Sequence, residues 1–307
     1  MKKILSATII LLSWGGLVAQ TPMITDGLMV PKGVLGNGAF YGNDSWKNYW
    51  EGTLKRDNQN IGTVTTQSVA WMGVYGLKEK IILIGTLPYI WTNASSGTLS
   101  GRKGFQDLTM AVKYNFFKQE FGPSSLKFFA LGGFSLPVTN YSPDNLPLSI
   151  GMGSKTISWR FTSTYSYKEV WQLTASGAYT WRSNVYLDRP SYWFNNQQYT
   201  TNEVRMNNLF DFIVRAGYHQ PKWHAELFYT QQNTLGSGDM RRQETPFVAD
   251  QMNFSKAGAS FLWNVPQMKN LAARVWGSYT VAGRNVGQST SVIAGLMYTL
   301  PISKTQQ

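Results

Sequence analysis

The sequence has no cysteine, only two histidines and few charged residues. Without cysteine the chain has no disulfide scaffold, no thiolate metal site and no acylated N-terminal cysteine of a lipoprotein. His219 and His224 flank a short turn at Gln220–Lys222 and have no serine or acidic partner at a recognised catalytic spacing. Two histidines alone also make a poor metal site. We therefore expect no catalytic residues, no cofactor and no metal, and interpret both histidines as interfacial residues beside the turn.

Long apolar runs are also lacking after residue 20, which excludes membrane-spanning helices, since these need roughly 20 apolar residues. Residues 1–19 are typical of a cleavable export signal: Lys2 and Lys3 precede an apolar stretch at 4–18, and Ala19 offers a small residue for cleavage. A retained signal anchor is the alternative. Export places the mature chain in the periplasm, in the outer membrane or outside the cell.

Aromatic residues and glycine are abundant, which suits pleated strands better than helices. The net charge is +12. Removing Lys2 and Lys3 leaves 26 basic residues (28 − 2) and 16 acidic ones, or +10. Because an exported protein does not meet nucleic acid, we expect this excess to face lipopolysaccharide phosphates and outer-membrane lipid.

Alternation of apolar and polar residues is the main structural signal. In Trp171–Arg182 one face carries tryptophan, leucine and tyrosine while the other carries glutamine, serine and threonine. Thr156–Tyr167 alternates in the same way, and only three residues separate the two segments, so they predict a hairpin. Similar alternation occurs at 208–219, 223–230 and 271–280 and, more weakly, at 47–55, 63–75, 81–92, 105–116, 126–137, 252–265 and 288–300.

These segments predict an all-β chain that forms a closed antiparallel transmembrane β-barrel of about twelve strands in the outer membrane of a Gram-negative bacterium. Turns near 77–80, 168–170, 220–222 and 266–270 are short and 117–125 is intermediate, whereas the connections at 93–104, 138–155, 183–207 and 232–251 are longer. Outer-membrane barrels have short periplasmic turns and long external loops, so both termini are expected in the periplasm. The connections 56–62 and 283–287 fit least well, because they are short but fall on the external side.

Aromatic residues at both ends of the strands support a membrane location. Tyr167, Trp171, Tyr218 and Trp223 lie beside short turns. The opposite ends carry Tyr89, Trp91, Tyr179, Trp181 and Tyr279. Two such belts are typical of membrane interfaces. A secreted β-sandwich, the alternative fold, would explain the alternation but not the two belts.

The polar faces of the strands predict the residues that line the lumen, because a basic side chain facing lipid at the midplane costs ~2–4 kcal/mol. These candidates are Asp107, Lys113, Arg160, Arg182, Asp211, Arg215, Glu226, Lys256, Arg274 and, as a large apolar residue in a polar row, Trp276. They either fill a narrow barrel with ion pairs or form a constriction that selects solutes. Asp211 and Arg215 fall on the same face of one strand.

The remaining parts of the chain are assigned by exclusion. The wall is expected to occupy 46–302, followed by a tail at 303–307. Residues 20–45, rich in glycine and containing Pro22 and Pro31, are expected to form either a plug within the lumen or a disordered periplasmic leader.

A resemblance to a known family follows from two motifs. Gly104–Tyr114, followed by Gly132–Val138, resembles the G-x-x-D-L…K-Y…G…L-P-x-G stretch of an outer-membrane transporter family named for the meta-cleavage pathway of phenol degradation. Thr139 stands where that family usually has glycine. The segment Asp44–Gly52 resembles members from the Bacteroidetes. The resemblance implies a barrel that passes hydrophobic or aromatic compounds, without established binding residues.

Two functions are compatible with these observations. The first is passive transport of small hydrophobic or aromatic solutes. The second is a non-transporting barrel that serves as a scaffold or binds partners through the loops 183–207 and 232–251, which a lumen closed from end to end would favour. A twelve-stranded barrel predicts a narrow, largely filled interior and low conductance. The sequence does not determine the solute or the oligomeric state.

Overall fold

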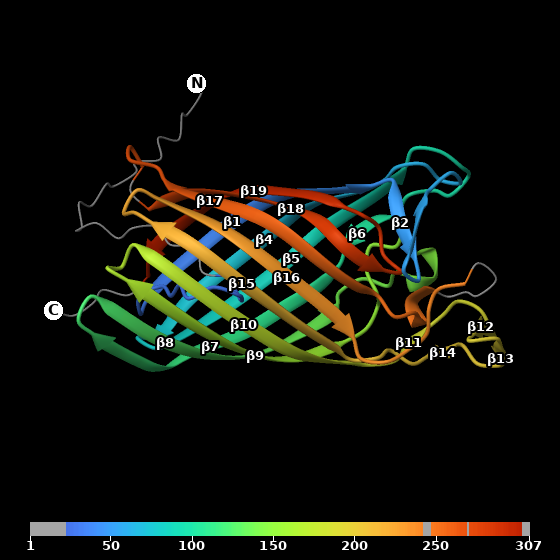
Figure 1. Cartoon of the computed structure of the whole chain (residues 1–307), viewed down its shortest axis with the longest axis horizontal. Coiled ribbons are helices and arrows are strands. Elements are labelled where there is room, and N and C mark those ends of the chain that lie inside the picture. The colour runs from blue at the N-terminus through green and yellow to red at the C-terminus, as the bar shows by residue number, and fades with distance from the viewer. Residues whose placement is uncertain (1–22, 242–246, 269, 303–307) are drawn as a thin grey trace, which may run out of the picture.

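Twelve antiparallel strands form a closed barrel in the computed structural model, which describes residues 23–241, 247–268 and 270–302 (Figure 1). The wall strands are β1 (Val34–Trp46), β4 (Val64–Lys78), β5 (Ile81–Ala94), β7 (Asp107–Phe121), β8 (Ser124–Pro137), β9 (Thr156–Tyr167), β10 (Trp171–Arg182), β15 (Leu209–His219), β16 (Trp223–Thr234), β17 (Asn253–Asn264), β18 (Leu271–Arg284) and β19 (Thr290–Pro301). Each pairs with the next, and β1 pairs with β19, so the wall closes on itself. The predicted closed barrel of about twelve strands is confirmed.

One end of the barrel has short turns and the other has long, structured connections. Lys168 and Glu169 adopt left-handed backbone angles (φ 52° and 57°) in the tight turn between β9 and β10. Val34 pairs with Pro301, so the wall begins and ends side by side. We call the end with these short turns the turn end and the opposite end the loop end. The predicted signal peptide (1–19) and the tail (303–307) lie outside the described residues.

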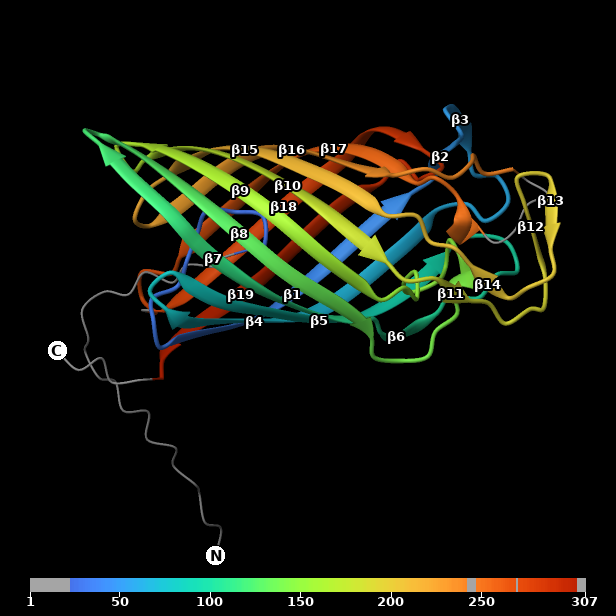
Figure 2. The same ribbon diagram turned by 90° about the horizontal axis from the view of Figure 1, so that it is seen from below.

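Several short elements gather at the loop end (Figures 1 and 2). They are β2 (Asn48–Glu51), β3 (Leu54–Asp57), β6 (Lys103–Phe105), β11 (Val185–Tyr186), β12 (Tyr192–Phe194), β13 (Gln197–Tyr199), β14 (Glu203–Val204) and the 3-10 helices η1 (Pro143–Asn145) and η2 (Phe247–Ala249). Val185, Tyr192, Met206 and Val248 are buried against one another, so these loops form a packed cap with its own small core. Within the described residues, no helix is long and apolar enough to cross a membrane.

The prediction for the first strand was wrong. The wall begins with β1 at Val34, and residues 47–55 belong to the β2–β3 hairpin at the loop end. The wall boundary expected at residue 46 therefore moves to 34. The inward face of β1 carries glycine at positions 36, 38 and 42. Because glycine is neither clearly apolar nor polar, the alternation between an apolar and a polar face is weak in this part of the sequence. The first long connection becomes 47–63, which removes one of the two misfits in the predicted alternation of loop lengths.

The outer surface of the wall is apolar and the inner surface is packed. In β10, Trp171 and Leu173 are 58% and 52% exposed, whereas Thr174 and Ser176, which follow them on the opposite face, are both 4% exposed. Large apolar side chains exposed over the outer surface of a closed barrel need lipid rather than water around them. This arrangement contradicts a secreted β-sandwich, whose apolar residues would point inward.

Aromatic rings contact one another along both rims of this outer surface. At the turn end Trp171 and Tyr218 lie 4.7 Å apart between ring centroids, and Tyr218 lies 5.5 Å from Trp223. At the loop end the ring centroids of Tyr89 and Trp91, which are successive outward-facing residues of β5, lie 6.3 Å apart. The two rims mark the interfaces between lipid hydrocarbon and water.

Closure of the wall predicts heat-modifiable mobility. Because each wall strand is hydrogen-bonded on both sides, unfolding requires the whole ring of strands to open together. The protein is therefore expected to migrate faster on SDS gels when left unheated than after boiling. Equal mobility of the two samples, with folding checked by circular dichroism, would contradict a closed wall.

Candidate functional site

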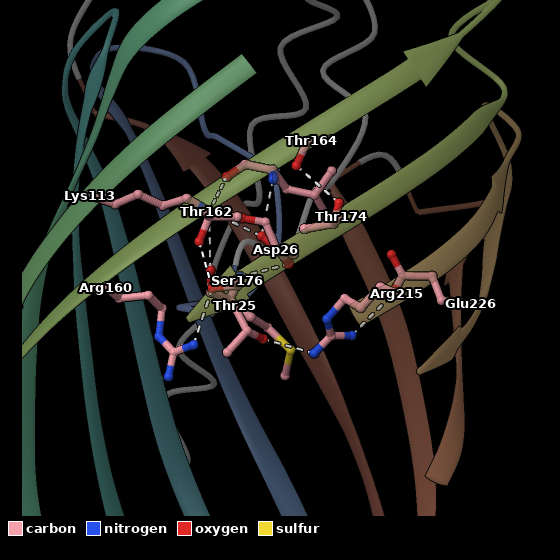
Figure 3. A network of polar contacts seen from close by, with 12 residues as sticks. Thr25, Asp26, Lys113, Arg160, Thr162, Thr164, Thr174, Ser176, Arg215 and Glu226 are labelled. Atoms are coloured by element: carbon pink, nitrogen blue, oxygen red, sulfur yellow. Dashed lines mark hydrogen bonds and ion pairs between the residues drawn. The ribbon is translucent and has the colours of Figure 1, made fainter. Parts of the chain in front are cut away.

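Residues 23–30 lie inside the barrel, where they form a plug that the exposed Pro31 and Lys32 connect to the start of β1. Their polar contacts reach β7, β15 and β18, three strands separated from one another around the wall. Asp26 is 2% exposed. A Cβ atom added to Gly27 would lie 2.9 Å from Cβ of Thr164 on β9, which shows how closely the plug approaches yet another part of the wall. Figure 3 shows Thr25 and Asp26 enclosed by wall residues.

Lys113 of β7 holds the plug through several contacts. Its Nζ lies 3.2 Å from Oδ1 of Asp26 and donates to the carbonyls of Met23 (3.2 Å) and Leu28 (3.0 Å), as well as to the carbonyl of Asp26. The Lys113 side chain is fully buried. All these acceptors belong to residues 23–28. A buried ammonium is costly without such partners, so Lys113 and the plug depend on each other.

Two arginines complete the cationic side of the site. Arg274 lies 3.6 Å from the Asp26 carboxylate and 3.5 Å from the Glu226 carboxylate. Arg215 pairs with Glu226 at 3.2 Å and donates to the hydroxyl of Thr25 at 2.8 Å (Figure 3). Lys113, Arg215 and Arg274 therefore surround two carboxylates, one from the wall and one from the plug. We call these three basic residues the lumen cations.

Each lumen cation also lies over an aromatic ring. The distance from the charged group to the ring centroid is 5.0 Å for Lys113 and Phe129, 5.3 Å for Arg215 and Phe228, and 6.0 Å for Arg274 and Trp276. These contacts fall within the range of cation–π attraction. The site thus combines positive charge with flat apolar surface.

The lumen has one apolar side and one polar side. Inward residues of β1, β4, β5 and β19 pack with Val30 of the plug in an apolar cluster: Phe40, Met72, Val74, Ile82, Ile84 and Met297. The opposite wall presents hydroxyl pairs from β9 and β10, Thr162 with Ser176 and Thr164 with Thr174 (Figure 3). The plug matches this division, since Met23, Ile24 and Met29 pack against the apolar cluster.

The structure places the predicted lumen residues in separate groups. Lys113, Arg215, Glu226, Arg274 and Trp276 meet around the plug. Trp276 also contacts Phe40, with ring centroids 5.7 Å apart.

The other predicted lumen residues lie outside this group. Arg160 pairs with Asp211 and donates to Ser176 at 3.1 Å. Asp211 and Arg215, although on one face, have different partners. Lys256 lies 3.7 Å from Asp44 of β1.

Asp107 and Arg182 lie toward the loop end. Arg182 donates from Nε to the carbonyl of Asn207 at 2.6 Å. Tyr141, in the connection between β8 and β9, donates its hydroxyl proton to Asp107. Burial and this hydrogen bond raise the pKa of Tyr141 above its ordinary value, so it remains a neutral donor. Asp107 and Arg182 therefore attach the cap to the wall and do not hold the plug.

The interpretation of the histidines needs correction. His219 and His224 face the lumen near the turn end, not the lipid interface, and their rings stack at 4.3 Å. His219 is 6% exposed, and its Nε2 lies 3.2 Å from the Glu226 carboxylate. In the described part of the chain no cluster of histidines and acidic residues is suited to hold a metal ion.

Asp26 is the central residue that sequence reasoning missed. It is the only acidic residue among positions 20–43 and is followed by the apolar residues Leu28, Met29 and Val30. The ten residues predicted to line the lumen include six basic residues but only three acidic ones. This imbalance, together with an isolated acid in an exported N-terminal segment, was a signal that the segment supplies a missing carboxylate.

Comparisons with known proteins agree with this architecture. Residues 57–294 match the model of a family described as "Putative MetA-pathway of phenol degradation". Among solved structures, an outer-membrane channel from Pseudomonas putida F1 is 13% identical, with a TM-score of 0.70 over 92% of this chain and all of that chain. The NanC porin is 8% identical, with a TM-score of 0.45 over 85% of this chain and all of that one.

A third solved structure is that of OprD from Pseudomonas aeruginosa, which is 9% identical, with a TM-score of 0.37 over 93% of this chain and 98% of that one. None of the curated proteins compared with the chain matches it. The similarity to the Pseudomonas putida channel supports the barrel fold described above.

Proposed function

Because the chain belongs to the family described for the MetA pathway of phenol degradation and is an outer-membrane β-barrel, we propose that it is a passive channel for small hydrophobic or aromatic solutes. The apolar side of the lumen is the observation that carries the proposal. Water-filled porins have polar interiors, which hydrophobic solutes do not favour. Here side chains such as Phe40, Met72 and Trp276 offer such solutes an apolar surface.

The plug closes this path through contacts that can be released. Its polar contacts are ion pairs and hydrogen bonds made by Lys113, Arg215 and Arg274, and no wall strand has to separate for it to leave. A twelve-stranded barrel without the plug would enclose a wider lumen than the eight-stranded barrels that side chains fill. We infer that the plugged barrel is one state of a gated channel.

A cysteine pair tests the proposal, because the chain has no cysteine of its own. Gly27→Cys combined with Thr164→Cys should form a disulfide between plug and wall after a shift of about 1 Å, since Cβ atoms in disulfides lie ~3.8 Å apart. Cells that produce this variant are assayed for entry of a labelled aromatic alcohol, with and without a membrane-permeable reductant.

We expect entry of the alcohol to require the reductant in the double variant and to be independent of it in each single variant. Entry of arabinose, a hydrophilic solute of similar size, is the control and should remain slow. Equal entry of the alcohol with and without the protein, when the barrel is correctly folded, would contradict a transport function. That result would instead favour a barrel that binds partners through its packed cap.

Sidedness is part of the same proposal. The turn end should face the periplasm and the loop end should face the outside, because outer-membrane barrels have short periplasmic turns and long external loops. Epitopes inserted within 183–207 are expected to bind antibody on intact cells, whereas epitopes within 168–170 or 220–222 should bind only after permeabilisation. The opposite labelling would reverse the orientation.

A further inference from the structure

The plug binds the lumen as an amphipathic carboxylate would. Its carboxylate, from Asp26, lies between Lys113 and Arg274, while its apolar residues Met29 and Val30 lie against the apolar side of the lumen. From this geometry we propose that the lumen cations form a binding site for small aromatic carboxylates, which compete with Asp26 and thereby displace the plug. The inference rests on the proposed channel function and specifies its solute class.

The charges around the site explain why an anion is needed. With the plug in place, three lumen cations face two carboxylates, those of Asp26 and Glu226. Among the described residues, removal of Asp26 leaves Glu226 as the carboxylate that these cations contact. Positive charges in a low-dielectric interior are unstable without partners, so withdrawal of the plug favours the entry of another anion.

Glu226 cannot take over the role of Asp26, because its own partners already fix it. Its carboxylate accepts from Arg215 (3.2 Å) and Ser260 (3.1 Å), lies 3.5 Å from Arg274, and contacts His219. Lys113, by contrast, makes its hydrogen bonds to residues 23–28. Loss of the plug therefore leaves Lys113, which is fully buried while the plug is docked, as the cation that loses most of its acceptors.

Arg215 provides a second, independent observation. The residue is 7% exposed, and its Nε–H group has no hydrogen-bond acceptor among the described residues. An unused donor this deeply buried destabilises the protein unless a ligand satisfies it. Its guanidinium lies over Phe228. A carboxylate bound there would meet both the unused donor and a flat apolar surface.

The aromatic rings define the remainder of the ligand. Phe129, Phe228 and Trp276 lie beneath the three lumen cations at 5.0–6.0 Å, and Phe40 continues this surface next to Trp276. The lumen cations would bind the carboxylate of a ligand, and the aromatic rings would pack against its aromatic ring. Benzoate is the simplest ligand of this class. Benzamide, which has the same shape without the charge, should bind weakly.

The test measures binding rather than transport, by isothermal titration calorimetry on the full-length protein in detergent. The Asp26 carboxylate accepts from the backbone N–H groups of Met23 and Leu28 through separate oxygens, so Asp26→Asn keeps an acceptor for one of them and removes the competing charge. We expect benzoate to bind this variant about tenfold or more tightly than the unaltered protein, while benzamide changes little. Adding Arg215→Met to Asp26→Asn should abolish the gain.

Asp44→Asn is the matched control, because it removes another lumen carboxylate that pairs with Lys256 and does not contact the plug. It should leave benzoate affinity unchanged. Equal affinity of the Asp26→Asn variant for benzoate and benzamide would overturn the site, and equal affinity for acetate and benzoate would overturn its aromatic part. Transport of neutral aromatic alcohols without benzoate binding would reject only this inference, whereas benzoate binding without any transport would reject only the channel.

Discussion

Asp26→Lys is expected to open the lumen. The substitution places a fourth cation among Lys113, Arg215 and Arg274 and removes the carboxylate that pairs with two of them. Breaking one buried ion pair costs about 3–5 kcal/mol, which lowers the occupancy of the docked plug by roughly a hundredfold or more. Single-channel recordings in planar bilayers should therefore change from rare, small openings to a sustained conductance.

A charge swap separates this effect from general damage. Lys113→Glu added to Asp26→Lys restores one opposite-charge contact between plug and wall and should return the conductance toward its original low level. Asp44→Lys, which changes a lumen carboxylate away from the plug, should leave the plug docked. If Asp26→Lys and the unaltered protein conduct equally, the contacts of Asp26 do not close the channel.

Val275→Arg is expected to hinder insertion of the barrel into membranes. Val275 lies on the outer face of β18, is 41% exposed, and has Phe261 and Ala294 as cross-strand neighbours. An arginine facing lipid near the midplane costs ~2–4 kcal/mol, which corresponds to about a 30- to 1000-fold loss in the folding equilibrium. The measurement is the folded fraction in lipid vesicles, read from heat-modifiable mobility over a urea series.

Two variants on the same strand control for this result. Val275→Leu keeps an apolar side chain and should fold normally. Ser278→Arg places the same charge on the inward face, opposite Gly258 and Ser291 and away from lipid. If Val275→Arg folds as well as Ser278→Arg, the inner and outer faces assigned to β18 are reversed, because a shift by one residue exchanges them.

Most of the wall could be predicted because strand alternation is a local property. A side chain at every second position points the same way, so Trp171 and Leu173 identify a lipid face and Thr174 an inner face without knowledge of other strands. Turn residues such as Lys168 and Glu169 then mark where the direction reverses. The family resemblance, quoted for Gly104–Tyr114 and Gly132–Val138, is confirmed by the match over residues 57–294.

The prediction failed where this local contrast is weak. Gly36, Gly38 and Gly42 give β1 no recognisable inner face, and the aromatic-rich hairpin at 47–55 resembled a strand more strongly. The turn between β7 and β8 is also shorter than the predicted 117–125, because both strands extend and leave only 122–123 between them. A bulge between Asn115 and Phe117 shifts the alternation there by one residue and hides this extension.

The amino-acid sequence by itself determined the class of fold, the approximate strand number and the inward direction of Lys113, Arg215 and Arg274, because each depends on residues close together in the chain. Only the tertiary structure decided which charges meet. Asp26 and Lys113 are 87 positions apart, and Thr25 and Arg215 are 190 apart. Closing twelve strands into a ring brings these positions within hydrogen-bonding distance, and no periodic pattern encodes a contact across the centre of that ring.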